Sequence, residues 1–515
     1  MENKQKIILT FVVIGLVFGL GFAAKKLLLP KIQEARVAQT SSQTNYKTNV
    51  RIGADSFPGY AVLRSPNFRD QLGRSEIGVQ VIAPAADDTD MYGNRMKALK
   101  KGDLNMAVFT IDSDIVAGIS ESALADVTIF LLIDDSNGAD GMVAYKQAVQ
   151  NAAALNRAQT KIVATGDSPS ETLARQLVAN MLPALGSQDW LVSAKSPDDV
   201  LDQLKKADKN AKTAYVLWEP ALSKALALPG VIQIYDTSKV NGAIVDVLAV
   251  NRKFLIEQPT VVRAVEEAYF RALHTYQVAP NGMTKLVMDD AKLNGDTLTE
   301  EQAKKIANGI QWKNTMENYA QFGLLSAADL HGLPTMREMI ASISQFLLKT
   351  GKLKSNPTDG HEQDLYYDGT LRAMQQANFH PGQAQDEIVR GVANLPALTD
   401  DEWKSLITVG DMDARAISFA RGKADIEIQG TRDVKDVADR LKAWPTYYLT
   451  VIGHARNDGD PAANLELAKA RSKSVVDELI SNGIAVARVK TSAEPSQTQS
   501  GTAQSVTFQL SQRPY

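Results

Sequence analysis

Short β-rich runs alternate with helix-length amphipathic stretches from Val50 onward, and few folds are compatible with this alternation. It is typical of a mostly parallel sheet covered by helices. The predicted strands are 79–82, 106–110, 127–132, 161–164, 214–217, 231–235 and 245–250. The predicted helices are 89–100, 170–181, 197–206 and 259–276. We therefore predict an α/β fold over residues 48–385.

Polar, turn-forming segments follow several of the predicted strands. These segments are 54–60, 110–113, 134–140, 165–168 and 218–220. Open sheets of this kind bind ligands in the crevice at the carboxyl ends of their strands. A ligand site is therefore expected where these segments meet.

Four motifs in this region are Phe57-Pro58-Gly59-Tyr60, Leu99-Lys100-Lys101-Gly102-Asp103-Leu104, Ser136-Asn137-Gly138-Ala139-Asp140 and Leu217-Trp218-Glu219-Pro220. Their order and spacing resemble the type 2 periplasmic substrate-binding proteins of the nitrate, sulfonate and thiamine-precursor group. The resemblance implies a two-lobed fold whose α/β lobes are joined by crossing segments and close by a hinge over a small molecule. Such a protein binds its ligand without transforming it.

The resemblance also implies a set of ligand-binding residues, in which aromatic side chains supply apolar faces and Asp, Ser and Thr side chains supply hydrogen bonds. The set is Asp55, Ser56, Phe57, Tyr60, Thr110, Asp112, Ser136, Asn137, Asp140, Thr165, Ser168, Trp218, Glu219 and Asp246.

Each group also has a structural interpretation. Ser168-Pro169-Ser170-Glu171 fits a helix capping box, Trp218 fits hinge or core packing, and Asp134 with Asp135 fits a solvated turn.

The expected site is rich in carboxylates. The strand-end segments and their neighbours contain Asp55, Asp112, Asp114, Asp134, Asp135, Asp140 and Glu219, but no lysine or arginine. An anion would be desolvated there beside charges of its own sign, with no basic group to offset the repulsion. We therefore expect a neutral or amine-bearing ligand, or an empty vestigial cleft.

Residues 281–385 have a helical pattern, with predicted helices at 300–309, 336–347 and 370–376. No separate fold is evident in this segment. We predict that it continues the second lobe.

The N-terminus carries an uncharged run from Ile7 to Ala24, flanked by lysines on both sides. Its helical length, roughly 27 Å, is sufficient to cross a bilayer. The alternative is a cleaved signal peptide, but the run is long and Ala23-Ala24-Lys25 is a poor cleavage site. We predict a transmembrane helix as an anchor at 1–30 and a linker at 31–47. The flanking charges do not decide the orientation, and we place the body in the periplasm, on the bacterial inner membrane, from the nature of its domains.

Residues 400–515 form a second α/β pattern. Strands are predicted at 417–419, 447–452 and 506–510, and helices at 434–442 and 461–482. Gly453-His454-Ala455, Asn464, Leu467, Ala470-Arg471 and the stretch from Gly483 to Arg488 resemble the OmpA C-terminal family, which binds peptidoglycan.

The resemblance implies an OmpA-like α/β sandwich in which Asn464 and Arg471 share one helix face and the arginine binds a diaminopimelate carboxylate. Arg456 stands where the family has an aspartate, and Asp458 is a candidate substitute. Two interpretations follow, namely a peptidoglycan site formed by Asp458, Asn464 and Arg471, or a ligand site that is altered or lost.

Composition excludes several classes of function. Lysine and arginine total 56 against 59 acidic residues, so no sequence-wide basic field is available for nucleic acid. Cysteine is absent and the five histidines lack metal-ligand spacing. We predict no cofactor, no metal and no enzymatic activity. The two remaining hypotheses are a solute-binding protein of an ABC importer, working with an ABC permease, and a non-transport envelope scaffold or sensor.

Overall fold

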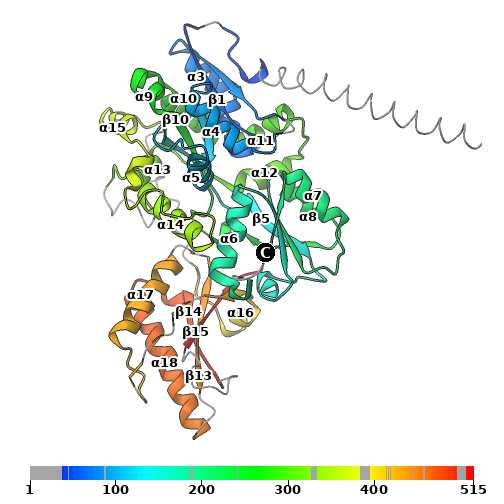
Figure 1. Ribbon diagram of the computed structural model, residues 1–515, viewed down its shortest axis with the longest axis vertical. Coiled ribbons are helices and arrows are strands. Elements are labelled where there is room, and N and C mark those ends of the chain that lie inside the picture. Colours follow the sequence, from blue (N-terminus) through cyan, green and yellow to red (C-terminus); the bar gives the residue numbers. More distant parts are fainter. Residues whose placement is uncertain are drawn as a thin grey trace, which may run out of the picture.

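The computed structural model describes residues 38–514, apart from 45, 86–87, 186–188, 241, 326–332, 383–394, 413, 416, 418, 421, 443, 445, 456–458 and 496–505. Three α/β units follow one another along the long axis of the molecule (Figure 1). In this part of the chain, no helix combines the length and apolar character needed to cross a membrane. The predicted anchor at 1–30 and most of the predicted linker lie outside the described residues.

The first lobe is built on a sheet whose described strands run in the order β11-β4-β10-β3-β1-β2. The bounds are β1 Thr48–Gly53, β2 Ile77–Ile82, β3 Met106–Thr110, β4 Val127–Ser136, β10 Val245–Asn251 and β11 Ile310–Trp312. Strand β1 pairs in parallel with β2 and β3, whereas β10 is antiparallel to both β3 and β4. This register places Asp246 between Thr110 and Asp134.

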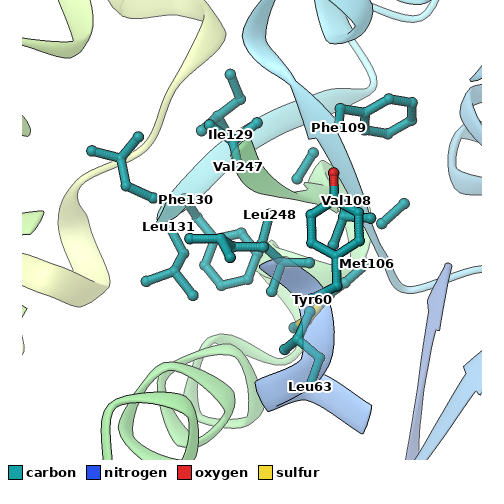
Figure 2. Close-up of a cluster of buried hydrophobic side chains, with 14 of the residues drawn as sticks. Tyr60, Leu63, Met106, Val108, Phe109, Ile129, Phe130, Leu131, Val247 and Leu248 are labelled. Atoms are coloured by element: carbon teal, nitrogen blue, oxygen red, sulfur yellow. The ribbon is translucent and has the colours of Figure 1, made fainter. Parts of the chain in front are cut away.

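Continuous apolar runs in β3, β4 and β10 form the core of the first lobe, because helices cover both faces of the sheet. Val108, Phe130 and Leu248 are fully buried. Figure 2 shows these side chains together with Tyr60, which belongs to the same cluster. The helices of this lobe are α2 Ala61–Arg64, α3 Pro66–Gly73, α4 Met91–Lys101, α5 Ile111–Ser120, α9 Arg252–Glu257, α10 Pro259–Val278, α11 Gly282–Leu293, α12 Glu300–Asn308, α13 Thr315–Gln321, α14 Met336–Lys349 and α15 Gly369–Gln376.

The second lobe is built on a smaller sheet with the described order β7-β6-β8-β5-β9. Its strands are β5 Asp140–Tyr145, β6 Lys161–Thr165, β7 Leu191–Ala194, β8 Thr213–Trp218 and β9 Val231–Asp236, and its helices are α6 Pro169–Met181, α7 Pro197–Lys206 and α8 Ala221–Leu226. Helix α7 has the predicted bounds because Ser196 caps it, Pro197 opens it, and Val200 and Leu204 repeat at helical spacing toward the core.

Two segments cross between the lobes. Residues 137–139 lead from β4 to β5, and residues 237–244 lead from β9 back to β10 in the first sheet. The prediction of two α/β lobes joined by crossing segments is therefore confirmed.

The segment 281–385 belongs to the first lobe, so its predicted assignment to the second lobe is wrong. Leu286, Ile306, Ile340 and Leu371 all pack into the first-lobe core. The physical reason is that β10 returns the chain to the first sheet, and the helices that follow cover that sheet's exposed apolar surface.

The C-terminal unit has four described strands in the order β12-β15-β13-β14. Its elements are α16 Asp400–Ser405, β12 Ile407–Asp411, α17 Ile428–Lys442, β13 Tyr448–Ala455, α18 Pro461–Ser481, β14 Val489–Pro495 and β15 Val506–Gln512. The strand predicted at 417–419 is wrong, since Phe419 makes only an isolated bridge to Ile426. The two edge strands of this described sheet are β12, which pairs with β15, and β14, which pairs with β13.

The C-terminal unit packs directly on the second lobe. Tyr235 and Ile234 of β9 belong to one apolar cluster with Val409, Trp444 and Tyr447 of the C-terminal unit. A side-chain carbon added at Gly410 would lie 2.5 Å from the carbonyl oxygen of Met181, so β12 and the end of α6 are in close backbone contact. The two units therefore share a continuous core.

Candidate functional site

A small cavity lies between the two lobes, and both lobes and the second crossing segment line it. Its volume is about 20 Å³, which is enough for roughly one water molecule. The lining residues are Asp55, Phe57, Tyr60, Tyr92, Thr110, Asp140, Pro169, Trp218, Ile244 and Asp246. Seven of the fourteen residues expected at a ligand site meet here, namely Asp55, Phe57, Tyr60, Thr110, Asp140, Trp218 and Asp246.

Arg64 holds the aromatic turn after β1, residues 57–60, in place. Its guanidinium makes a two-pronged ion pair with Asp290, at 2.6 and 2.8 Å, and donates to the carbonyl oxygens of Asp55 and Phe57 at 2.5 and 2.8 Å. The rings of Phe57 and Tyr60 then meet edge to face with centroids 5.4 Å apart. Arg64 is therefore a positioning residue for the cavity wall.

Gly59 lets this turn approach the sheet. A side-chain carbon at Gly59 would lie 2.3 Å from Asp134 Oδ2 and 2.4 Å from the Phe57 ring. The Gly59 carbonyl oxygen also accepts a hydrogen bond from the Trp312 indole at 2.8 Å. No larger residue fits between Asp134 and Phe57 without displacing one of them.

Two buried carboxyls, Asp134 and Asp246, face each other on adjacent strands. The Tyr60 hydroxyl donates to Asp246 Oδ1. With both carboxyls ionised, no donor in the described chain reaches Asp246 Oδ2 or either oxygen of Asp134, whereas a proton on one of them allows a hydrogen bond between the two side chains. Burial raises the pKa of Asp134 to about 8, and burial together with the neighbouring Asp134 raises the pKa of Asp246 well above its ordinary value. A proton shared by the two carboxyls would satisfy both.

Asp140 is a third buried carboxyl at the cavity. Its Oδ2 accepts a hydrogen bond from Ser136 Oγ at 2.6 Å, and burial raises its pKa to about 7. Asp134 was also interpreted as part of a solvated turn, and this interpretation is wrong because the residue lies in β4 and is fully buried.

Besides Arg64, two further basic residues lie beside the site without lining the cavity. Arg95 of α4 pairs with Asp55 at 2.8 Å and donates to the Val108 carbonyl at 2.7 Å. Lys313, which follows β11, lies 3.8 Å from Asp135. Neither cation lines the cavity, and both are engaged by carboxylates other than Asp134, Asp140 and Asp246.

Several residues expected to bind ligand lie outside this cavity, and one of them forms a hydrogen bond between the lobes. Asp112 Oδ2 accepts a hydrogen bond from Thr172 Oγ1 across the lobes. Ser168 and Asp112 line a second, smaller cavity beside α14, and Thr165 is buried outside both cavities. Ser168 does not form the expected capping box, because its hydroxyl donates to the Thr165 carbonyl at 2.7 Å.

The remaining expected residues also lie outside the cavity lining. Ser56 is exposed, and the backbone N–H of Asn137 donates to the Gly309 carbonyl at 2.8 Å. Ser136 bridges Asp140 and Thr237, and Glu219 accepts both the Ser223 hydroxyl and its backbone N–H at the start of α8. These residues shape the crossing segments and the neighbouring helix.

Tyr92, Pro169, Ile244 and Arg95 are site residues that the sequence patterns did not identify. Tyr92 and Arg95 lie inside a predicted helix. A helical pattern does not indicate which strands the helix will pack beside, so these two residues could not be assigned to the site. The available signal was a basic residue about one turn into α4, the helix after β2.

The C-terminal unit presents the predicted arginine on α18. Arg471 Nε donates to the Lys423 carbonyl at 3.0 Å, and its guanidinium lies 5.0 Å from the centre of the Phe419 ring. His454 Nε2 lies 2.7 Å from Thr507 Oγ1. Asn464 lies in the first turn of the same helix, whereas Arg456 and Asp458 fall outside the described residues.

Comparison with solved structures finds similar folds over about two thirds of the chain. A ligand-binding component of an ABC-type import system from Staphylococcus aureus has 12% identity and a TM-score of 0.46, covering 64% of this chain and 98% of its own. The nitrate-binding protein NrtA from Synechocystis has 14% identity and a TM-score of 0.47, covering 68% and 93%. The aliphatic sulphonate-binding protein SsuA from Escherichia coli has 14% identity and a TM-score of 0.45, covering 62% and 92%.

These similarities do not assign a ligand to this chain. No curated protein matches it in sequence. The C-terminal unit, in contrast, matches a family model, that of the OmpA family, over residues 418–507. The chain therefore carries an OmpA-family domain at residues 418–507.

Proposed function

We propose that this chain is a solute-binding protein of the bacterial cell envelope, anchored by its N-terminus and working outside the cytoplasm. The observation that supports this function is the cavity whose lining comes from two lobes and a segment that crosses between them. Rotation about the crossing segments 137–139 and 237–244 would open the cavity to solvent and close it over a ligand.

The charges in the cavity favour a neutral or amine-bearing ligand. Arg95 and Lys313 are paired with Asp55 and Asp135. The residues that line the cavity include no lysine or arginine to receive an anion, and an anion would be repelled by Asp140 or Asp246 wherever that carboxyl is ionised. This charge pattern argues against nitrate, phosphate and sulfonates as ligands.

The test uses the absence of cysteine from the chain. Cysteines introduced at the exposed positions Asp70 in α3 and Lys205 in α7 would carry spin labels on opposite lobes of the full-length protein. Compounds that stabilise the protein in a thermal-shift library are then added one at a time. A ligand should shorten the mean distance between the two spin labels and narrow the distribution of that distance. If no compound in the library changes the mean or the width, the proposal is contradicted.

Contact with peptidoglycan is a second part of the proposed function. It is supported by the OmpA-family match and by Arg471 on α18. Purified cell-wall sacculi should retain the full-length protein, and Arg456→Asp should retain more of it because an aspartate there would attract the diaminopimelate amine. Loss of retention in Arg471→Ala is expected, and equal retention of all three proteins would exclude this site.

An envelope scaffold or sensor remains the alternative function. It is favoured by the small volume of the cavity and by α14, which belongs to the first-lobe core but contacts α6 of the second lobe. Uptake assays in cells that carry a candidate ABC permease and ATPase separate the two functions. Ligand-induced closure without any dependence of uptake on this chain would identify a sensor.

A further inference from the structure

The cavity between the lobes combines aromatic rings with a carboxylate oxygen that has no donor. Phe57, Tyr60, Tyr92 and Trp218 contribute rings to the lining. Asp246 lines the same cavity from β10 and is 1% exposed. Its Oδ1 receives the Tyr60 hydroxyl, whereas its Oδ2 receives no hydrogen bond from the described residues.

A proton or a cation is needed to satisfy this oxygen. The adjacent carboxyl is Asp134, which is 0% exposed and likewise lacks a donor in the described chain. Asp134 can form a hydrogen bond with Asp246 only when one of the two carboxyls carries a proton. The basic residues of the site do not replace that proton, since Arg95 pairs with Asp55 at 2.8 Å and Lys313 lies 3.8 Å from Asp135.

The size and lining of the cavity indicate which kind of cation fits. A volume of about 20 Å³ accepts a group about as large as water. A primary ammonium group has that size and carries three N–H donors. Aromatic faces attract cations of any type, but a quaternary ammonium group is larger and has no N–H to donate to Asp246.

We propose that this cavity binds the primary ammonium end of a small solute, with Asp246 Oδ2 accepting an N–H and the rings of Tyr60 and Trp218 lying around the charge. Asp134 supplies the second negative charge, and the ammonium group takes the place of the proton that the two carboxyls otherwise share. Opening of the lobes about the crossing segments would make room for the rest of the solute. This inference rests on the proposed solute-binding function and names the chemical group that the site selects.

The test is a calorimetric titration of the full-length protein with methylammonium chloride. Tetramethylammonium, potassium and methanesulfonate serve as comparison probes at equal ionic strength. Methylammonium should bind saturably and at least about tenfold more tightly than tetramethylammonium or potassium, a difference that corresponds to about 1.4 kcal/mol. This comparison needs no variant, so it holds even if a substitution in the cavity impairs folding.

Asp246→Asn should weaken methylammonium binding at least about tenfold, because an amide removes the charge and retains the shape. Glu266→Gln is the matched control. Glu266 is equally buried in the first lobe, receives a hydrogen bond from Thr370 at 2.8 Å and lies outside the cavity, so its variant should bind as the unmodified protein does.

Equal binding of methylammonium and potassium, or saturable binding of methanesulfonate, would overturn the ammonium site. The ammonium site is also overturned if a library ligand closes the spin-labelled lobes and methylammonium does not compete with that ligand for binding. In that last case the proposed solute-binding function stands. If no compound closes the lobes and methylammonium does not bind, both proposals fail.

Discussion

Asp134 and Asp246 face each other across two neighbouring strands, and neither forms an ion pair with the described residues. Burial and the neighbouring Asp134 and Asp140 raise the pKa of Asp246, whereas the Tyr60 hydrogen bond lowers it and Lys313 lowers the pKa of Asp134. A buried carboxyl in such surroundings keeps its proton at a pH where an exposed one has lost it. The stability of the first lobe is therefore linked to pH.

The direction of this linkage follows from the raised pKa values. Between the ordinary value of 3.8 and about 8, the folded chain holds a proton on Asp134 that the unfolded chain has released. The resulting stabilisation is complete below the lower value and is lost as the pH rises through the folded value. Each pH unit in this window lowers the free energy of unfolding by up to about 1.4 kcal/mol per group.

Melting temperatures measured between about pH 5 and pH 8.5 should therefore fall with rising pH in the unmodified protein. Asp246→Asn should flatten this dependence, because its amide cannot ionise and can donate to Asp134. The exposed Asp103→Asn serves as control and should retain the slope of the unmodified protein. If the melting temperature depends on pH in the same way in all three proteins, a carboxyl other than Asp246 or Asp134 causes the dependence.

Helix α14 connects the lobes at a point away from the crossing segments. Ile340 and Leu347 are buried in the first-lobe core, while Lys352, just after the helix, pairs with Glu171 of α6 at 2.9 Å and also with Asp167. The Thr350 carbonyl accepts a hydrogen bond from Arg175 of α6 at 3.0 Å. These contacts favour the closed arrangement.

Lys352→Met should loosen that arrangement, since it preserves the length of the side chain and removes the charge. The expected loss is about 1 kcal/mol, because the Lys352 side chain is 18% exposed and solvent screens the pair. Hydrogen exchange at the start of α6 should accelerate and the distance between lobe labels should broaden. The exposed Lys354→Ala should change neither quantity, and an unchanged Lys352→Met would show that apolar packing alone joins α14 to the second lobe.

The sequence patterns predicted the elements with strong local signals. Strand β3 and helix α7 have the expected bounds because a continuous apolar run and a capped amphipathic turn are each unambiguous. Strand β5 was missed because it begins with Asp140 and Gly141, which have the composition of a turn. Its pairing with β8 and β9 depends on residues distant in the sequence.

The same distinction holds for the site. Phe57, Tyr60 and Trp218 were predicted because the ends of strands meet at one edge of a sheet. Arg95 was not predicted, since its partner Asp55 comes from another element and only the packing of α4 brings them together. Lys313 was missed for the same reason, because β11 joins the sheet from far along the chain.

At the scale of the whole molecule, the shared core between the second lobe and the OmpA-family domain makes them one cooperative unit. Trp444→Ala removes a side chain that is 3% exposed in that core and should cost about 3–5 kcal/mol. Exchange-protected amides in β6 and α6 should lose protection together with those of β13. Trp403→Ala, whose ring contacts Tyr448 outside this core, should leave β6 unaffected. Loss of protection confined to β13 would mean that the two units unfold independently.

The shared core has a mechanical consequence if the proposed membrane anchor and the proposed wall contact hold the chain at both ends. The described chain enters the first lobe at β1, while the OmpA-family domain shares its core with the second lobe. Tension between the bilayer and the wall would then run through the ligand cavity and pull its two halves apart. A bound solute would resist that pull, and by reciprocity a stretched envelope would release the solute more readily.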